Sequence, residues 1–238
     1  MNAFGFTEVY RSSFFLREGN RVKRPTKAVH APRLPAPSTE GARHRAPSRA
    51  LAAFVGFVMV LLAAACDSGS TVATSKLSQL VLREQDMPRF TSFANGPQVR
   101  LDNQGTVRAD ASRYGREGGW ITRLRPADST TTAGPLVVES RADLFKTPDG
   151  ARSDIAAYRV LFSQLSGEHK EIVVSGLGQD AVGVTFTQPG GRTLRFFRLA
   201  WRYQNATASI TVEGFDGQVS QDDAMALAHK QEKRIEGA

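Results

Sequence analysis

The first pattern that could carry chemistry is a glycine-rich turn at residues 176–181, which reads Gly-Leu-Gly-Gln-Asp-Ala. It follows an apolar run at 172–174 and matches the G-x-G-x-x-A fingerprint of dinucleotide-binding loops. Such a loop must open a helix whose N-terminal amides meet the pyrophosphate, with an acidic residue about 20 positions further on. Residues 182–186 instead predict a strand, and no acidic residue lies between Asp180 and Glu213. We therefore predict a tight turn between strands and no bound cofactor.

Nucleophilic or metal-assisted catalysis has few candidate residues in this chain. After Cys66, which is the one cysteine, the sequence contains two histidines, His169 and His229. His169 lies in a charged run and His229 lies beside Lys230, so we expect both on the solvent-exposed surface. A His-rich metal site is excluded, and the G-x-S-x-G and S-x-x-K patterns of serine hydrolases do not occur after Cys66. The residues predict a protein that is not an enzyme and holds no metal.

Paired carboxylates are the remaining catalytic alternative. Asp102 with Asp110, or Asp222 with Asp223, could act as an acid/base pair of the kind that hydrolyses glycosidic bonds. The first pair frames a predicted turn and the second begins a predicted helix, where acidic side chains are favoured by the helix dipole. We prefer these structural roles, and an envelope hydrolase using an Asp/Glu pair stays open as the alternative.

Four aromatic side chains are candidates for contact with a ligand. Phe197, Trp201 and Tyr203 fall at alternate positions of one predicted strand, and Trp120 begins another. Alternate positions of a strand point to the same face of the sheet. Such a stripe can line a ligand cavity or belong to the hydrophobic core, and both readings stay open.

The same strand carries a second stripe, which is basic. Arg198 and Arg202 share the face opposite to the aromatic residues, so we expect that face to meet water. With Arg192 and Arg195 they could touch lipid head groups or acidic glycans. A solvated sheet face is the preferred interpretation.

The charge of the chain is concentrated before Cys66. The 238 residues carry a formal net charge of +8, but residues 1–65 contain ten basic and three acidic residues, which leaves the remainder nearly neutral. Nucleic acid is therefore not a predicted partner. Residues 1–50 are basic and proline-containing, and we expect a disordered or mis-annotated leader there.

Residues 51–65 form an uncharged apolar run that ends at Cys66. As a helix the run would extend about 22 Å, which is short of the roughly 30 Å hydrocarbon core of a membrane, so a secretory signal is favoured over a permanent span. Residues 62–66, Leu-Ala-Ala-Ala-Cys, resemble the lipobox of bacterial lipoproteins. The resemblance implies cleavage between Ala65 and Cys66, a lipid on Cys66, and a location on the extracytoplasmic face of the cell membrane.

Two main helices and several strands are expected after a tether at 66–74. Thr147 and Ser220 are N-cap residues of the two helices, which run to about Gly167 and Gly237, and a short helix is expected around Leu77. The predicted strands cover 90–101 (interrupted at 95–97), 120–125, 135–140, 172–175, 181–188, 192–204 and 206–213. We predict one α+β domain at 75–238, with an antiparallel sheet of about five to seven strands packed by two main helices.

The pattern from Leu77 to Ile235 resembles small uncharacterised lipoproteins of actinobacteria. It is more faintly similar to the α/β sandwiches of lipoproteins and sensor-kinase exodomains that bind ligands or partners. The resemblance implies location and fold more than activity. Because the tethered domain has an aromatic sheet face and no catalytic set of residues, we predict a non-enzymatic module that binds an apolar ligand or an envelope protein. A purely structural role in envelope assembly is a further alternative.

Overall fold

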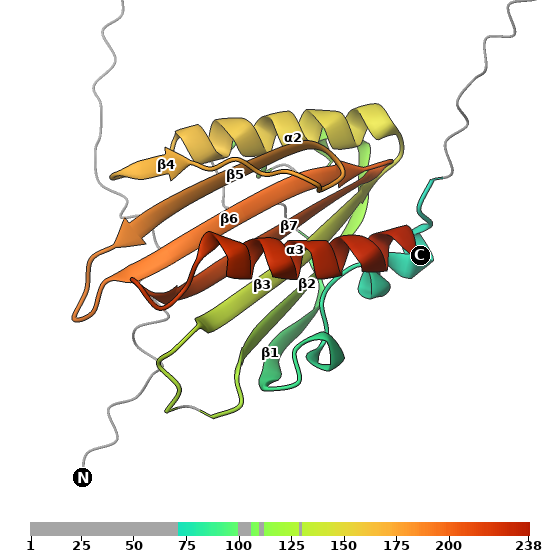
Figure 1. Cartoon of the computed structure of the whole chain (residues 1–238). Coiled ribbons are helices and arrows are strands. Elements are labelled where there is room, and N and C mark those ends of the chain that lie inside the picture. The colour runs from blue at the N-terminus through green and yellow to red at the C-terminus, as the bar shows by residue number, and fades with distance from the viewer. Residues whose placement is uncertain (1–70, 100–105, 110–111, 129) are drawn as a thin grey trace, which may run out of the picture. The chain divides into compact units, whose positions relative to one another are not determined.

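The computed structural model describes residues 71–99, 106–109, 112–128 and 130–238 (Figure 1). The expectations for the leader, for the apolar run at 51–65 and for the lipid site at Cys66 lie outside these residues. Within them, no helix is long and apolar enough to cross a membrane.

Seven antiparallel strands form one sheet in the order β1-β2-β3-β7-β6-β5-β4. With its two main helices this confirms the predicted α+β fold. The predicted hairpin of β2 with β3 and the meander β5-β6-β7 are also present. The strands are β1 (Phe90–Pro97), β2 (Arg116–Pro126), β3 (Pro135–Phe145), β4 (His169–Glu171), β5 (Gln179–Gln188), β6 (Leu194–Tyr203) and β7 (Ala206–Phe215).

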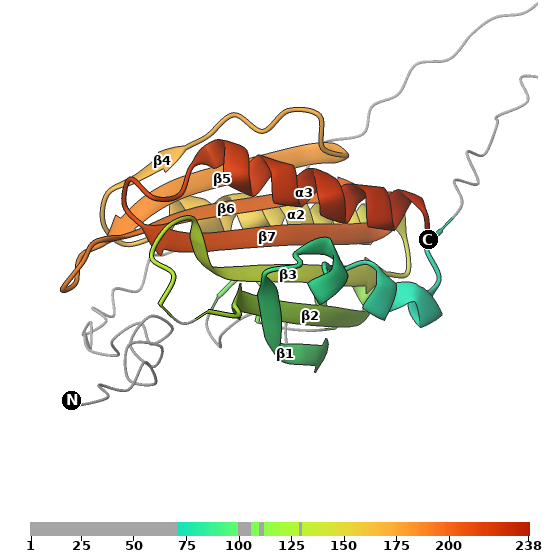
Figure 2. The same cartoon turned by 60° about the horizontal axis from the view of Figure 1, so that its bottom comes forward.

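The two main helices cover opposite faces of the sheet, as the two views in Figures 1 and 2 show. Helix α2 (Pro148–Ser163) is capped by Thr147, whose hydroxyl accepts a hydrogen bond from the Gly150 amide at 3.2 Å. Helix α3 (Gln221–Glu236) begins with a capping box between Ser220 and Asp223. Both N-caps are as predicted from the sequence, because each side-chain oxygen satisfies an amide that the helix itself leaves unpaired.

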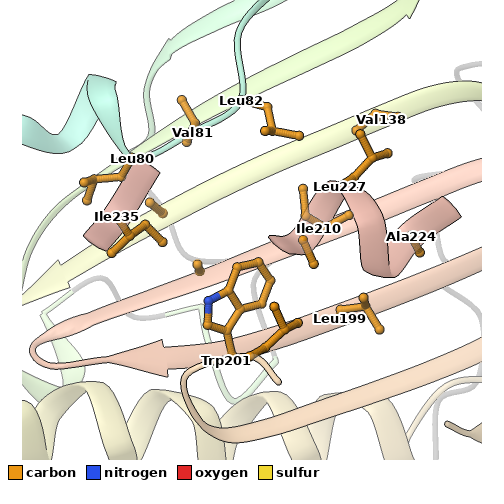
Figure 3. Packing of buried hydrophobic residues seen from close by; sticks show 14 of the residues in the cluster. Leu80, Val81, Leu82, Val138, Leu199, Trp201, Ile210, Ala224, Leu227 and Ile235 are labelled. Atoms are coloured by element: carbon orange, nitrogen blue, oxygen red, sulfur yellow. The ribbon is translucent and has the colours of Figure 1, made fainter. Parts of the chain in front are cut away.

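The α3 face of the sheet is closed by hydrophobic side chains (Figure 3). The segment before β1 adds to this layer beside α3. It contains two 3-10 helices, η1 (Thr74–Gln79), which is the short helix expected around Leu77, and η2 (Glu84–Asp86). The buried residues labelled in Figure 3 are Leu80, Val81, Leu82, Val138, Leu199, Trp201, Ile210, Ala224, Leu227 and Ile235.

The α2 face of the sheet is also covered, which contradicts the expected solvated face of β6. Ala200 packs with Ile155 and Tyr158 of α2, and the Arg202 side chain is buried. The predicted alternation along β6 is present, but helix α2 packs on the side of the strand that carries the arginines. A strand buried on both faces cannot be recognised from one apolar stripe.

Two predicted strand positions were wrong at the edges of the sheet. Residues 95–97 do not interrupt β1: Asn95 and Pro97 stay paired with β2, and the irregularity falls between Ser92 and Ala94. An edge strand tolerates proline because its outward amide needs no partner in the sheet. At the other edge the strand is β4, His169–Glu171, instead of 172–175.

The chain enters the domain earlier than the predicted boundary at residue 75. Val72, assigned to the tether from the sequence, is buried, and its amide donates to Asn205 Oδ1 at 2.8 Å. The Asn205 amide group donates to the Val72 carbonyl at 3.3 Å and to the Phe145 carbonyl at 2.9 Å. Val72, near the start of the described residues, is therefore held by the connection between β6 and β7.

Candidate functional site

An open groove of about 550 Å³ lies where η1 meets the end of β1 and the start of β2. The size is within the range of small-molecule sites. Seven polar or charged side chains, four apolar side chains and two glycines line it. The lining residues are Thr74, Ser75, Leu77, Ser78, Pro97, Gln98, Val99, Ser112, Arg116, Glu117, Gly118, Gly119 and Trp120.

Trp120 is the aromatic residue of this groove. Its ring is half-buried, and its indole N–H donates to Asn95 Oδ1 at 2.6 Å across the β1–β2 pair. Thr122 donates to the same oxygen at 3.2 Å. Since the edge of the indole is held by β1, the ring is fixed before any ligand arrives, which lowers the entropy cost of binding to it.

The two glycines before Trp120 allow close packing on both sides of β2. A Cβ on Gly118 would lie 2.9 Å from Leu77 Cδ1, so η1 can approach the strand only because this position has no side chain. A Cβ on Gly119 would collide with the Arg116 guanidinium and the Asp143 carboxylate. The Gly-Gly-Trp sequence thus places η1 on one face and an ion pair on the other.

Arg116 is the one basic residue of the lining, and its guanidinium is already engaged. Nε and Nη2 donate to Asp143 Oδ1 at 2.8 and 2.6 Å. Nη2 also donates to the Gln98 carbonyl at 2.6 Å, and Nη1 donates to the Val99 carbonyl at 3.1 Å. The side chain is 4% exposed, so it holds the groove wall in place and offers little charge to a ligand.

Gln98 and Glu117 bring hydrogen-bond acceptors to the groove. Gln98 Oε1 is buried and has no hydrogen-bond partner among the residues that the structure describes. The exposed Glu117 carboxylate accepts from the Thr74 hydroxyl at 3.3 Å, a long contact that leaves most of its capacity unused. A buried acceptor without a donor is costly, so a ligand donor would relieve this cost if the Gln98 side chain turned toward the groove.

The other three candidate aromatics lie elsewhere. Phe197 and Trp201 belong to the core beneath α3, and Tyr203 packs against that core. The Trp201 side chain is fully buried, while its Nε1 has no partner among the described residues. Trp120 also packs against this core, but it is only partly buried and it is the one of the four that lines the open groove.

The glycine-rich turn has the geometry of a connection between strands. Gly176 has φ +71°, and the following residues enter β5 at Gln179 instead of opening a helix. The Gly178 amide donates to Glu232 Oε1 of α3 at 2.7 Å. The amide that a pyrophosphate would need is thus occupied by a side chain of α3, and the prediction of a tight turn is confirmed.

The histidines and carboxylates singled out from the sequence are not assembled into a site. His169 pairs with Phe186 as part of β4, where a solvated loop was expected, and half-buried His229 lies against Gly176. Asp222 and Asp223 occupy the first turn of α3, as predicted. The pair of Asp102 with Asp110 falls outside the described residues, which contain no group of three or more His, Cys, Asp or Glu side chains able to hold a metal.

A buried ionic network on the α2 face was missed by sequence reasoning. Arg108 donates to both oxygens of Asp154 at 2.8 and 2.9 Å, and to Asp143 at 3.3 Å. Asp143 also binds Arg116 and Arg141, at 2.6 and 3.0 Å. A sequence signal existed: Asp154 lies on the apolar side of α2, where a carboxylate requires a cation.

The carboxylates of this network are closed to catalysis. Burial by itself raises the pKa of Asp143, but Arg141, Arg108 and Arg116 outweigh it and hold the pKa below its ordinary value. Asp154 accepts in addition from the Thr207 hydroxyl at 2.8 Å, and both carboxylates are at most 1% exposed. The two carboxylates share Arg108 and form a buried structural pair that substrate cannot reach.

The four basic residues of the β6 region each have a specific neighbour, instead of forming a free basic strand. Arg195 pairs with Asp216 at 2.9 Å and Arg202 with Asp180 at 3.1 Å. The guanidinium of Arg192 lies 3.5 Å from the centre of the Phe215 ring, and that of Arg198 lies 5.0 Å from the Phe186 ring.

Comparison with known proteins gives a fold likeness and no family. No family model matches the chain, and no curated protein sequence matches it. The extracellular domain of PknH from Mycobacterium tuberculosis has a similar structure, with a TM-score of 0.55 at 14% sequence identity. The match covers 71% of this chain and 99% of that domain. It shows that the two chains share a fold.

Proposed function

We propose that this protein is a non-enzymatic binding module, anchored by a lipid on Cys66 to the extracytoplasmic face of the membrane, whose ligand occupies the groove beside Trp120. The anchor is supported by the apolar run at 51–65 that ends at a lipobox-like cysteine. The extracytoplasmic location is supported by the fold shared with the extracellular domain of PknH.

The observation that carries the binding role is the fixed, half-exposed Trp120 ring in an open groove. Apolar contact surface comes from Leu77, Pro97 and Val99, of which Val99 is 79% exposed. A preformed aromatic platform beside a few polar groups is the usual composition of a small-ligand site. The mixed lining favours an amphipathic ligand over the wholly apolar one expected from the sequence.

The groove lies close to the proposed anchor along the chain. Thr74, the first lining residue, follows Cys66 by eight positions. A fully extended chain spans at most about 3.6 Å per residue, so Thr74 would lie within roughly 29 Å of Cys66. A ligand in the groove would therefore be held near the outer surface of the membrane.

A non-catalytic role is supported by the state of the buried carboxylates. Asp143 and Asp154 are the nearest approach to the paired carboxylates of a hydrolase, and arginines occupy both. General acid/base catalysis needs a group that can exchange a proton with substrate, which these two positions do not offer.

The anchor is tested by the intact mass of the protein purified from membranes of its native host. We expect a chain that starts at Cys66 with an added mass of diacylglyceryl size, and a Cys66→Ala variant that lacks the addition. An unmodified wild-type chain that retains residues 1–65 would contradict the anchoring proposal.

The groove is tested by acrylamide quenching of tryptophan fluorescence in the lipidated protein, reconstituted in nanodiscs. The chain has two tryptophans, and Trp201 is fully buried, so a quencher reaches mainly Trp120. Hexaethylene glycol monodecyl ether and the neutral oligosaccharide chitotetraose are two amphipathic probes, of which at least one should protect Trp120, and a Trp120→Phe variant should lose the protected signal. Equal quenching with and without each probe would count against a ligand site at Trp120.

A further inference from the structure

We infer that the ligand of the Trp120 groove is a neutral saccharide, which lays the apolar face of a sugar ring on Trp120 and donates hydroxyl hydrogen bonds to the wall formed by Gln98 and Glu117. This inference rests on the proposed function and names the chemical class of its ligand. It follows from the charge of the lining, from its unused acceptors, and from the partly exposed Trp120 ring.

The charge of the lining disfavours an anionic ligand. Arg116 is the one cation, and four hydrogen bonds to Asp143, Gln98 and Val99 engage it. Glu117 is the one carboxylate, and it is exposed. A phosphate or carboxylate in the groove would meet the Glu117 charge without a free cation to balance it.

The unused hydrogen-bonding capacity of the lining calls for donors on the ligand. The exposed Glu117 carboxylate can only accept, and the buried Gln98 Oε1, which has no partner among the described residues, becomes a second acceptor when the Gln98 side chain turns toward the groove. Ser75 and Ser78 add hydroxyls that can donate or accept on the η1 side. An acyl chain would leave these groups without partners, whereas the hydroxyls of a sugar match both kinds of group.

The Trp120 ring supplies the other half of the recognition. One side of a pyranose ring presents C–H groups and its edge presents hydroxyls, which matches an aromatic face bordered by polar atoms. Because Asn95 holds the indole N–H, the ring stays at the groove in one orientation. Because Asp143 already pairs with Arg116, the Glu117 charge would also attract a basic peptide, which would stack a cation on the same indole, and a basic peptide is therefore one of the probes in the test.

The affinity for one short oligosaccharide is expected to be weak. A groove of this size contacts one or two rings, which gives a dissociation constant of roughly millimolar order. A polymer that engages many anchored copies would bind far more tightly through multivalency. The backbone of the bacterial cell wall is such a polymer of N-acetylated amino sugars, and free wall fragments have the same chemistry.

The test uses the lipidated full protein in nanodiscs and four soluble probes of matched size. Chitotetraose is the neutral saccharide, tetragalacturonate an acidic one, tetralysine a basic peptide and hexaethylene glycol monodecyl ether an apolar chain. Protection of Trp120 from acrylamide is measured first, and saturation-transfer NMR on the probes is used for variants that lack Trp120. We expect chitotetraose to protect Trp120 and to bind at least about tenfold more tightly than tetragalacturonate.

Three variants locate the site. Trp120→Ala should abolish saturation transfer to chitotetraose, and Glu117→Gln should weaken binding about three- to tenfold. Glu168→Gln, an exposed carboxylate on the loop before β4, is the matched control and should bind as the wild type does. Glu117 is exposed, so its variant keeps the test valid if Trp120→Ala fails to fold.

Each other outcome separates the ligand class from the proposed function. Protection by the decyl ether alone, or by tetralysine alone, would overturn the saccharide and leave a binding groove in place. No protection by any probe would overturn the saccharide and the proposed function together. If chitotetraose binds, sedimentation of the nanodiscs with insoluble cell wall shows that the polymer is the ligand, and failure to sediment shows that free fragments are.

Discussion

The two faces of the sheet are closed in different ways. On the α3 side, Leu199 and Ile210 meet the helix in a hydrophobic layer. On the α2 side, hydrophobic contact is confined to a small cluster around Ile155, and the neighbouring strands present the buried ions Asp143 and Arg141. Hydrophobic packing therefore fills the α3 face of the sheet, and buried ion pairs fill much of the α2 face.

This difference teaches where the domain tolerates change. Apolar packing loses free energy in proportion to the atoms removed, so substitutions on the α3 face should have graded effects. A buried ion pair contributes little net stability when complete, but it becomes a large penalty when one partner is lost. A single substitution in the ionic network of the α2 face should therefore lower the free energy of unfolding more than a substitution on the α3 face.

The largest effect is expected for Asp154→Ala, which leaves the buried Arg108 guanidinium without its two-bond partner. The expected loss of unfolding free energy is about 3–5 kcal/mol, measured by urea denaturation. Asp149→Ala removes an exposed pair with Arg152 on the same helix and should change stability by less than about 0.5 kcal/mol. Equal effects of the two substitutions would contradict this expectation.

Leu199→Ala on the α3 face comes next, with an expected loss of about 2–4 kcal/mol because a cavity remains beneath α3. Val160→Ala, at a 40% exposed position of α2, is the control and should cost less than about 0.5 kcal/mol. The double variant with Asp154→Ala should be additive, since the two side chains lie on opposite faces and share no partner. Strong coupling would mean that the faces do not act independently.

The helix caps give a smaller comparison. Ser220→Ala breaks a reciprocal box with Asp223, whereas Thr147→Ala removes a single hydrogen bond of 3.2 Å to Gly150. Each should cost about 1 kcal/mol, with the larger loss at Ser220. The two variants can be compared from their thermal midpoints, and a larger loss at Thr147 would contradict the order.

The smallest effect is a dependence on pH at Glu232, where α3 contacts the glycine-rich turn. Burial and the nearby Glu236 raise the pKa of the Glu232 carboxyl, although the Gly178 amide opposes this by donating to it. A raised native pKa contributes stability that is present below the unfolded value near 4.5 and is lost as pH rises through the native value. Glu232→Gln should therefore gain stability relative to the wild type from pH 4 to pH 7.5.

The pH dependence is read from urea midpoints at several pH values. A matched Glu168→Gln variant, at an exposed position, should follow the wild type at every pH. A Glu232→Gln variant that also follows the wild type would show that the carboxyl is not perturbed by its burial.

The α3 face could be predicted from the sequence and the α2 face could not, for a physical reason. Phe197, Leu199 and Trp201 alternate with polar residues, and this period is visible within one strand. The partners of the ionic network are 35 and 46 residues apart along the chain, and charged residues are ordinarily exposed. Ion pairs between residues so far apart along the chain produce no periodic pattern in the sequence.

The groove was predictable only in part. Trp120 was identified as a ligand-facing candidate by its residue type, yet the sequence grouped it with Trp201, which lies in the core. The groove itself arises because η1 packs against Gly118, a contact between residues 41 positions apart. That contact depends on the folded path of the chain before β1, which local propensity does not determine.

Two hydrogen bonds join Val72 to Asn205, so a force that pulls on the chain before Val72 would act on the domain at this point. A pull on the chain from the side of Cys66 enters the described residues at Thr71 and reaches Val72, where the amide and the carbonyl are both held. Asn205 passes that load to the β6–β7 connection and, through Phe145, to the end of β3. Tension on the chain would thus reach three adjoining central strands, β3, β7 and β6, before it reached the edge strand β1, which borders the groove.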